Sequence, residues 1–265
     1  PICVLINTIF ASYLETGSVA ALELANRLNI IIVGIFVFAI TNYIFPSLSR
    51  YSGGKNDTAF AGVMKSSLAS MVIIIAPIAA GIMLLSEEIV VILYARGQFD
   101  GKSVVQTATA LFFYSIGMLA YGTNEVLSKC FYASKDGKTP MIATIFGIIS
   151  VIVLAFVFTN ILHLGIGGLA LAASISAIAV AVVLIYKMNK NTYNLINKNT
   201  FIFVLKITAA VVITVIAAVI AKRLTIQFNE WITTIVSAAV ALPVYVISLY
   251  LFKIRRYFGG IKSNG

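Results

Sequence analysis

The sequence predicts an all-α integral membrane protein, a multi-helix bundle of long apolar helices. Hydrophobic residues make up 60% of the 265 positions, charged residues only 11%, and the mean hydropathy is +1.02. A soluble domain carries about 25% charged residues, so this composition does not supply a water-facing surface. The apolar residues are also gathered into long uncharged stretches, and a bilayer-spanning helix needs about 20 such residues.

Six uncharged stretches set the expected spans. They are residues 28–49, 66–86, 103–124, 139–186, 207–221 and 231–252. The fourth is about twice the length of one span and is interrupted by a turn-prone cluster between Asn160 and Gly168, so it predicts a helical hairpin. Because Lys206 can snorkel at a helix end, residues 201–221 also span. The sequence therefore predicts seven complete spans.

Residues 1–14 form one more apolar segment, which is too short to span the bilayer alone. The segment has neither a charged n-region nor a small-residue cleavage site, so we do not expect a signal peptide. We interpret it as the end of a helix that begins in a longer protein. With this partial helix, the chain enters the bilayer about eight times.

The connections between spans carry less information, with two exceptions. Residues 86–100 include several apolar side chains and predict a short helix on the outer surface. The run Gly165-Ile166-Gly167-Gly168 resembles a dinucleotide loop, but no strand precedes it. It predicts a turn followed by close helix packing through small residues.

The basic residues predict the orientation of the chain. If the C-terminal tail is cytoplasmic, fourteen of the 19 Lys and Arg residues lie at inner connections or in the tail. Only Arg96, Lys102, Lys222 and Arg223 lie outside. This asymmetry agrees with the positive-inside rule. The same charges attract anionic membrane lipid, and we expect no nucleic acid as a partner because stacking aromatics do not interleave them.

Arg27 is the one basic residue inside an expected span. With Ser18 as the N-cap, a helix starting at Val19 places Arg27 about 12 Å along its axis. An arginine at that depth is costly and usually faces a cavity or the bundle interior, and its fork of donors suits phosphate. Glu23, four residues earlier on the same face, supplies the alternative, a structural ion pair.

Glu125 leaves two interpretations open. It lies near the inner end of its helix, four residues before Lys129, so a surface ion pair explains it as well as a place in a cavity or an ion relay. Cys3 and Cys130 are expected to be packing residues and His163 a loop residue.

Catalytic chemistry has no candidate in this sequence. Nowhere do Ser, His, Asp, Cys or Glu residues recur at the spacing of a catalytic or metal site. We therefore expect a transporter rather than an enzyme, without a cofactor. The residues leave open whether a coupling ion or the membrane potential drives it.

Several short motifs in the first 140 residues agree in order and spacing with one transporter family. They are Ile6-Asn7-Thr8 with Ala11-Ser12, Gly17-Ser18-Val19, Ala25-Asn26-Arg27-Leu28, residues 45–50, residues 93–100 and residues 131–140. Through them the chain resembles the MurJ/MviN family of lipid II flippases, in the superfamily that includes MATE transporters. Beyond residue 140 the likeness is one of hydropathy and helix count.

The resemblance implies a fourteen-helix transporter with two six-helix lobes and two extra C-terminal helices. On that map the chain is the C-terminal portion. Residues 1–188 form the C-terminal lobe, from a truncated seventh helix through the twelfth, and 189–200 form a cytoplasmic linker. Residues 201–252 form the two additional helices, and 253–265 a basic cytoplasmic tail.

The resemblance also implies a function. The family moves lipid II, an undecaprenyl-pyrophosphate-linked peptidoglycan precursor, from the inner to the outer leaflet of the bacterial plasma membrane by alternating access. Arg27 matches an arginine of the cationic cavity between the lobes, and Asn26, Glu23 and Glu125 are the other candidate substrate-binding residues. Glu23 stands where the family favours an uncharged residue. The missing N-terminal lobe is an expected partner.

Two alternatives stay open at this point. One is a flippase for another polyprenyl-linked oligosaccharide, such as an O-antigen precursor. The other is a multidrug or cation exporter of the same superfamily, which would rely more on acidic residues within the membrane.

Overall fold

The computed structural model describes residues 2–52, 57–190, 197–225, 227 and 229–254, and within them the chain is helical with no strand. The segments are α1 (Ile2–Ser12), α2 (Ser18–Tyr51), α3 (Asp57–Leu84), α4 (Ser86–Tyr94), α5 (Gly101–Ala133), α6 (Lys138–Phe156), the π-helical η1 (Val157–Ile161), α7 (Gly165–Met188), α8 (Lys198–Thr225) and α9 (Glu230–Leu251). Seven of them, counting α6 with η1 as one, are long and apolar enough to cross a membrane. The predicted membrane bundle with seven spans is confirmed.

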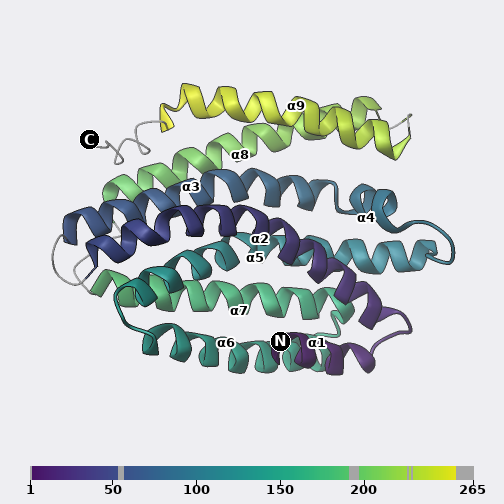
Figure 1. The fold of residues 1–265 in the computed structure, drawn as a ribbon. Coiled ribbons are helices and arrows are strands. Elements are labelled where there is room, and N and C mark those ends of the chain that lie inside the picture. The colour runs from purple at the N-terminus through teal and green to yellow at the C-terminus, as the bar shows by residue number, and fades with distance from the viewer. Residues whose placement is uncertain (1, 53–56, 191–196, 226, 228, 255–265) are drawn as a thin grey trace.

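The ends of the long helices gather at two ends of the bundle (Figure 1). The C-terminal ends of α2, α5, α7 and α9 lie at one end, and those of α1, α4, η1 and α8 lie at the other. This is the alternation that the charge distribution predicts, and we call the two ends inner and outer accordingly. Among the inner-side charges, Lys55, Arg255, Arg256 and Lys262 lie outside the described residues.

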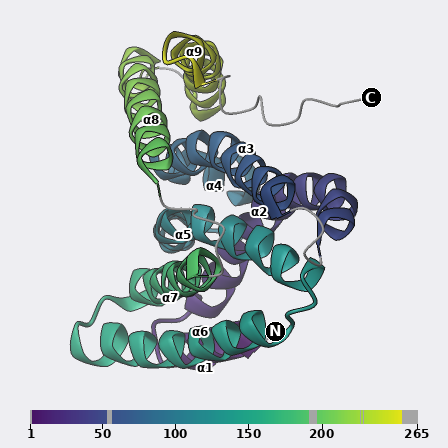
Figure 2. The ribbon, with the colours of Figure 1, turned by 90° about the vertical axis from the view of Figure 1, so that its left-hand side faces the viewer.

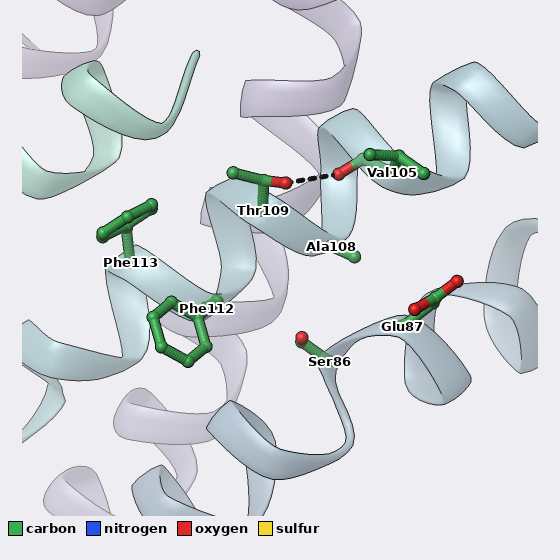
Figure 3. Close-up of a pocket in the computed structure, with 7 residues that line it drawn as sticks. All are labelled: Ser86, Glu87, Val105, Ala108, Thr109, Phe112 and Phe113. Carbon is green, nitrogen blue, oxygen red and sulfur yellow. Dashed lines mark hydrogen bonds between the residues drawn. The ribbon is translucent and has the colours of Figure 1, made fainter. Parts of the chain in front are cut away.

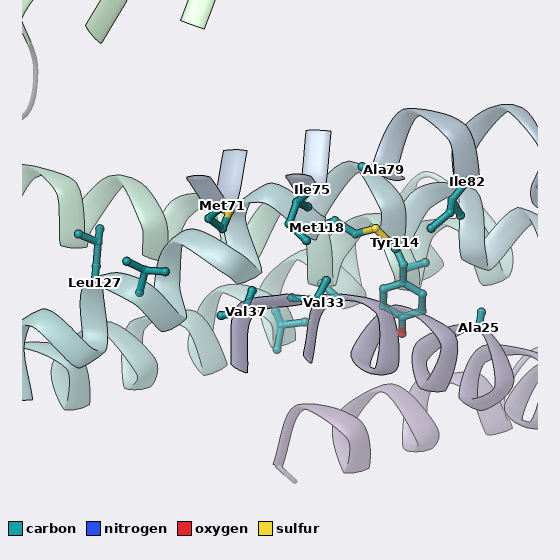
Figure 4. Packing of buried hydrophobic residues seen from close by; sticks show 14 of the residues in the cluster. Ala25, Val33, Val37, Met71, Ile75, Ala79, Ile82, Tyr114, Met118 and Leu127 are labelled. Carbon is teal, nitrogen blue, oxygen red and sulfur yellow. The ribbon is translucent and has the colours of Figure 1, made fainter. Parts of the chain in front are cut away.

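Helix α5 forms the centre of the bundle and packs against α2, α3, α4 and α7. Two of its large side chains, Tyr114 and Met118, are fully buried between these neighbours (Figure 4). At Gly117 the backbone approaches α7 so closely that an added Cβ would lie 2.7 Å from the hydroxyl oxygen of Ser174. That hydroxyl donates a 2.7 Å hydrogen bond to the carbonyl of Phe113. Small residues and one hydroxyl thus join α5 to α7.

The predicted hairpin between α6 and α7 is confirmed. The first arm continues through η1 to Ile161, and the turn passes through His163, an exposed residue with a φ of 49°. Gly167 lies in the second arm, where an added Cβ would approach the Phe113 ring to 2.8 Å. The glycine run therefore serves helix packing, as predicted.

Two aspartates and one glycine lie at the starts of three helices, α2, α5 and α6. Asp100 caps α5 by accepting the N–H of Ser103 at 2.8 Å. Before α6, Asp136 accepts the Thr139 N–H at 3.0 Å and its hydroxyl at 2.7 Å, and these bonds lower the pKa of the Asp136 carboxyl. The prediction that Ser18 caps α2 was wrong by one residue: Gly17 holds that position with a φ of 92°, and its carbonyl accepts the first helical bond at 3.0 Å.

Helices α8 and α9 form a hairpin of their own, which lies along α3 (Figure 2). A second cluster of buried residues joins the three helices: Ile73, Ala76, Phe203, Ile207, Ala210, Tyr245 and Ile254. The Lys206 ammonium has a partner within the protein, since it donates a 3.1 Å hydrogen bond to the carbonyl of Phe252 after α9. The predicted boundaries at 188 and 201 stay a prediction, and most of the linker and tail lies outside the described residues.

The segment between α3 and α5 contains the expected short helix. A single residue, Leu85, separates α3 from α4, and α4 packs against α5 and α9. Val90 anchors it with a completely buried side chain. The predicted short helix within residues 86–100 is confirmed and ends at Tyr94, and its place on the outer surface stays a prediction.

Candidate functional site

The candidate site begins with an ion pair on α2. The Arg27 guanidinium lies 2.6 Å from the Glu23 carboxylate, one helical turn earlier. The spanning part of α2 is Ser18–Asn42, and Ser18 lies at the outer end. Both residues of the pair are within ten positions of Ser18. The pair therefore lies in the outer half of the span, about 14 Å along the axis for Arg27.

This chain by itself does not bury the pair, and the expectation that Arg27 faces a cavity between two lobes stays a prediction. The side chains are 66% exposed for Arg27 and 51% for Glu23. The reason is the rotation of α2 about its own axis. Ala25 and Val33 on α2 face α5 (Figure 4), and residues two positions from Ala25 point about 160° away from that contact, given 100° per residue. Glu23 and Arg27 thus share the face that no helix of the described chain covers.

The same face of α2 continues as a strip of exposed apolar side chains toward the inner end. Its members are Ile30, Ile31, Ile35 and Phe38, which are 55–69% exposed. An ion pair at the outer end of an apolar strip is unusual for a surface that faces hydrocarbon, because charged groups in spans face protein or water. The open face of α2 is therefore suited to contact with another protein segment, with a water-filled cavity, or with a charged ligand.

The other two predicted residues lie differently. Asn26 is half-buried and lies next to Arg27 on α2. Glu125 is near the inner end of α5, 3.6 Å from Lys129, with its side chain 53% exposed. The structure therefore groups Glu23, Asn26 and Arg27 at the outer half of the bundle and leaves Glu125 apart from them in a surface ion pair.

Sequence reasoning missed a groove between α4 and α5, since its walls come from separate segments. The groove has a volume of about 310 Å³ and is lined by Ser86, Glu87, Val105, Ala108, Thr109, Phe112 and Phe113 (Figure 3). Its floor is apolar and aromatic, with the rings of Phe112 and Phe113 in edge contact at 5.3 Å. One carboxylate, that of Glu87, stands at its rim. These groups can bind an apolar molecule but offer no catalytic arrangement.

The remaining reactive side chains show no grouping for chemistry. Among the described residues, no three His, Cys, Asp or Glu side chains lie together as around a metal ion. Cys130 is a buried free thiol, as the packing interpretation predicted. The side chain of Cys3 lies outside the described residues. What the site offers is recognition, through one guanidinium with a carboxylate and an amide beside it.

Comparison with known proteins decides the family. A family model described as "Lipid II flippase MurJ" matches residues 2–242, which is most of the chain. The chain belongs to the MurJ family. Among its MurJ relatives is the probable lipid II flippase of Vibrio cholerae, which is 34% identical over 173 residues, or 65% of this chain and 33% of that protein. The corresponding protein of Thermotoga maritima is 32% identical over 184 residues, or 69% of this chain and 37% of that protein.

Solved structures show the same MurJ fold. A lipid II flippase MurJ in an inward closed conformation aligns with 96% of this chain and 51% of its own length, at a TM-score of 0.81 and 23% identity. An outward-facing multidrug resistance MATE transporter aligns with 96% of this chain and 62% of its own length, at a TM-score of 0.59 and 18% identity. The chain thus spans about half of the MurJ structure and about a third of the relatives above.

Proposed function

We propose that this chain is one part of a lipid II flippase, which moves a lipid-linked peptidoglycan precursor from the inner to the outer leaflet by alternating access. Membership of the MurJ family supports lipid II as the substrate class, since the relatives in that family are named as probable lipid II flippases. The observation that carries the proposal is the Glu23–Arg27 pair, which lies exposed on an otherwise apolar face of α2. A transporter needs such a face where its two halves enclose a substrate.

Arg27 is the residue that we assign to the pyrophosphate of the substrate. A guanidinium stays charged at every physiological pH and offers two parallel donors to a phosphate group. Its present partner, Glu23, holds it by one short contact of 2.6 Å, so its other donors point away from the carboxylate. Asn26 adds an uncharged amide on the neighbouring face. The rest of the longer protein, covering α2, would exclude hydrocarbon from the pair.

The orientation that we propose places the C-terminus in the cytoplasm of a bacterial cell, with the chain in its plasma membrane. The charge asymmetry supports it, because the described inner end carries Arg50, Lys129, Lys135, Lys138 and Lys187, among others. Flipping toward the outer leaflet then moves the pyrophosphate past the outer half of α2, where Arg27 lies. Neither a cofactor nor a particular coupling ion is part of this proposal.

The acidic residues favour a lipid-linked anion over a cation as the substrate. A cation exporter needs a carboxylate that is available to its substrate, and the two acids of interest here are each paired: Glu23 with Arg27 and Glu125 with Lys129. The likeness to MATE transporters shows the fold alone. An exporter of cations would therefore have to break both pairs.

Complementation tests the proposal. We expect Arg27→Ala in the full-length protein to abolish growth of a flippase-depleted strain at normal membrane levels, and Arg27→Lys to restore it only in part, because an ammonium keeps the charge but loses the fork of donors. Arg223→Ala is the matched control, since Arg223 is also exposed near the outer side. Normal growth with Arg27→Ala at normal levels would exclude Arg27 from substrate binding.

A further inference from the structure

We propose that Lys222 is an ionic latch, which fastens the outer end of the α8–α9 hairpin to the turn between α3 and α4. The Lys222 ammonium lies 2.5 Å from the Glu88 carboxylate of α4. It also donates a 3.1 Å hydrogen bond to the carbonyl of Leu84, the last residue of α3. One side chain of α8 thus binds two other helices at the same corner of the bundle.

The latch is built from groups with few other partners. Its side chains are 29% exposed for Lys222 and 13% for Glu88, whereas each side chain in the other three described ion pairs is at least 39% exposed. The second carboxylate oxygen of Glu88 is buried and has no hydrogen-bond partner among the described residues. A partly buried carboxylate in this position depends on Lys222 as its counter-ion.

The end of α3 and the start of α4 meet at this corner, and their partial charges favour the two side chains of the latch. Leu84 ends α3, where free carbonyls carry a partial negative charge, and a lysine ammonium is favourable at such an end. Glu88 lies in the first turn of α4, where an acidic side chain is favourable. The corner therefore attracts Lys222 through both the carboxylate and the helix end, which a lysine placed elsewhere on α8 would not experience.

The position of Lys222 gives the latch a mechanical role. Away from it, the hairpin is joined to the bundle by the second buried cluster on α3 and by contacts of α9 with α4. These attachments fall mainly on α3 and α4 (Figure 1). With the latch closed, the α8–α9 hairpin and the α3–α4 corner move as one body. With the latch open, the outer end of the hairpin loses its ion pair with Glu88 and its hydrogen bond to Leu84.

The latch also fixes one wall of the groove between α4 and α5. Ser86 and Glu87, which form that wall, lie between Leu84 and Glu88 in the chain (Figure 3). Because Lys222 holds the residues on both sides of them, the width of the groove depends on the latch. Its opening would widen the groove.

The experiment measures distances between spin labels in the full-length protein in lipid nanodiscs. One pair of labels, at Leu93 on α4 and Leu224 on α8, reports the outer end, and a second pair, at Asp57 on α3 and Phe201 on α8, reports the inner end; all four side chains are exposed. The variants are Lys222→Met and Glu88→Gln. The control is Arg223→Met, since no described ion pair involves this neighbouring arginine.

We expect both variants to add a longer-distance population at the outer pair only, and the control to leave both distances unchanged. The exchanged variant Lys222→Glu with Glu88→Lys should restore the wild-type distance in part, since it rebuilds the ion pair without the Leu84 hydrogen bond. Unchanged outer distances in both single variants would overturn the proposal, as would a change at both ends, which would make the pair a general stability element. No recovery in the exchanged variant would overturn the ion pair as the basis of the latch.

Discussion

The hydroxyl of Tyr245 on α9 donates a 2.7 Å hydrogen bond to the backbone carbonyl of Ile73 on α3, across 172 positions of sequence. Both residues are more than nine-tenths buried. The bond therefore fixes the height of the C-terminal hairpin along α3, whereas the apolar contacts around it would tolerate sliding. A tyrosine that looks like an ordinary apolar residue in the sequence thus makes a directional contact between the α8–α9 hairpin and α3.

Replacing Tyr245 by Phe removes only that hydroxyl. We expect a loss of about 1 kcal/mol, because the ring packing stays and the Ile73 carbonyl loses one of its donors. The loss should be local, so hydrogen exchange would rise in α8 and α9 and stay unchanged in α5. Thermal unfolding in detergent, followed with exchange in the same samples, checks both points. Equal exchange in all helices would contradict the fixing role of this bond.

The contact between α5 and α7 gives a second prediction. Gly117→Ala places a methyl group within 3.0 Å of the Ser174 backbone and side chain, so the helices must separate, at a cost of about 1–3 kcal/mol. Gly81→Ala is the matched control, since a Cβ there meets nothing within 4 Å. Because alanine favours helix over glycine, this control should be neutral or stabilising by up to about 1 kcal/mol. Equal stability of the two variants would show that α7 can shift at no cost.

These contacts mark what the sequence could predict and what it could not. Uncharged runs of bilayer length predicted the seven spans, and loop charges predicted the alternation of the connections, since both depend on local composition alone. The Tyr245–Ile73 and Ser174–Phe113 bonds depend on the rotation of each helix against its neighbour. In an apolar helix, every face looks alike in the sequence, so nothing there indicates which face packs where.

The helix cap at Asp136 predicts a dependence of stability on pH. Bonds from the Thr139 hydroxyl and backbone hold the pKa of Asp136 below its ordinary value. A lowered pKa in the folded state means that the cap stabilises the protein above the ordinary aspartate pKa and is lost as the pH falls through the folded value. Asp136→Ala should therefore cost about 1 kcal/mol at neutral pH and little in strong acid. A difference that is the same at both pH values would disprove the charged cap.

The orientation can be tested with single cysteines in a cysteine-free full-length protein. We expect a cysteine at Ser52, in the turn after α2, to react only with a reagent on the cytoplasmic side, and one at Gly101, at the start of α5, only from outside. Thr192 is a further cytoplasmic position, although it lies outside the described residues. Cytoplasmic labelling of Gly101 would reverse the whole topology.

For the candidate site, the sequence predicted the ion pair, and the role of its residues stays a prediction. Composition alone indicated Arg27, because one guanidinium among apolar residues needs a reason, and the i, i+4 spacing predicted the pair with Glu23 that the structure confirms. The cavity that we expect around Arg27 stays a prediction, because it depends on what covers α2 and the described chain covers only the opposite face. The sequence did not predict the Lys222–Glu88 pair, because a charged residue at the end of a span is ordinarily solvated and indicates no partner.

The exposure of the Glu23–Arg27 pair leads to the last prediction, which separates a structural role from a substrate-binding one. An exposed i, i+4 pair contributes only about 0.3–0.5 kcal/mol, so Arg27→Ala should leave the amount of folded protein nearly unchanged. If the pair were structural, Arg27→Ala would lower that amount and a second change, Glu23→Ala, would restore it. We expect neither effect. Glu23→Gln should instead free the guanidinium and strengthen the binding of a soluble pyrophosphate analogue, measured by calorimetry on the purified full-length protein, whereas Arg27→Ala should abolish it. Weaker binding with Glu23→Gln would mean that the carboxylate holds Arg27 in its binding position, and the two residues would then act as one unit.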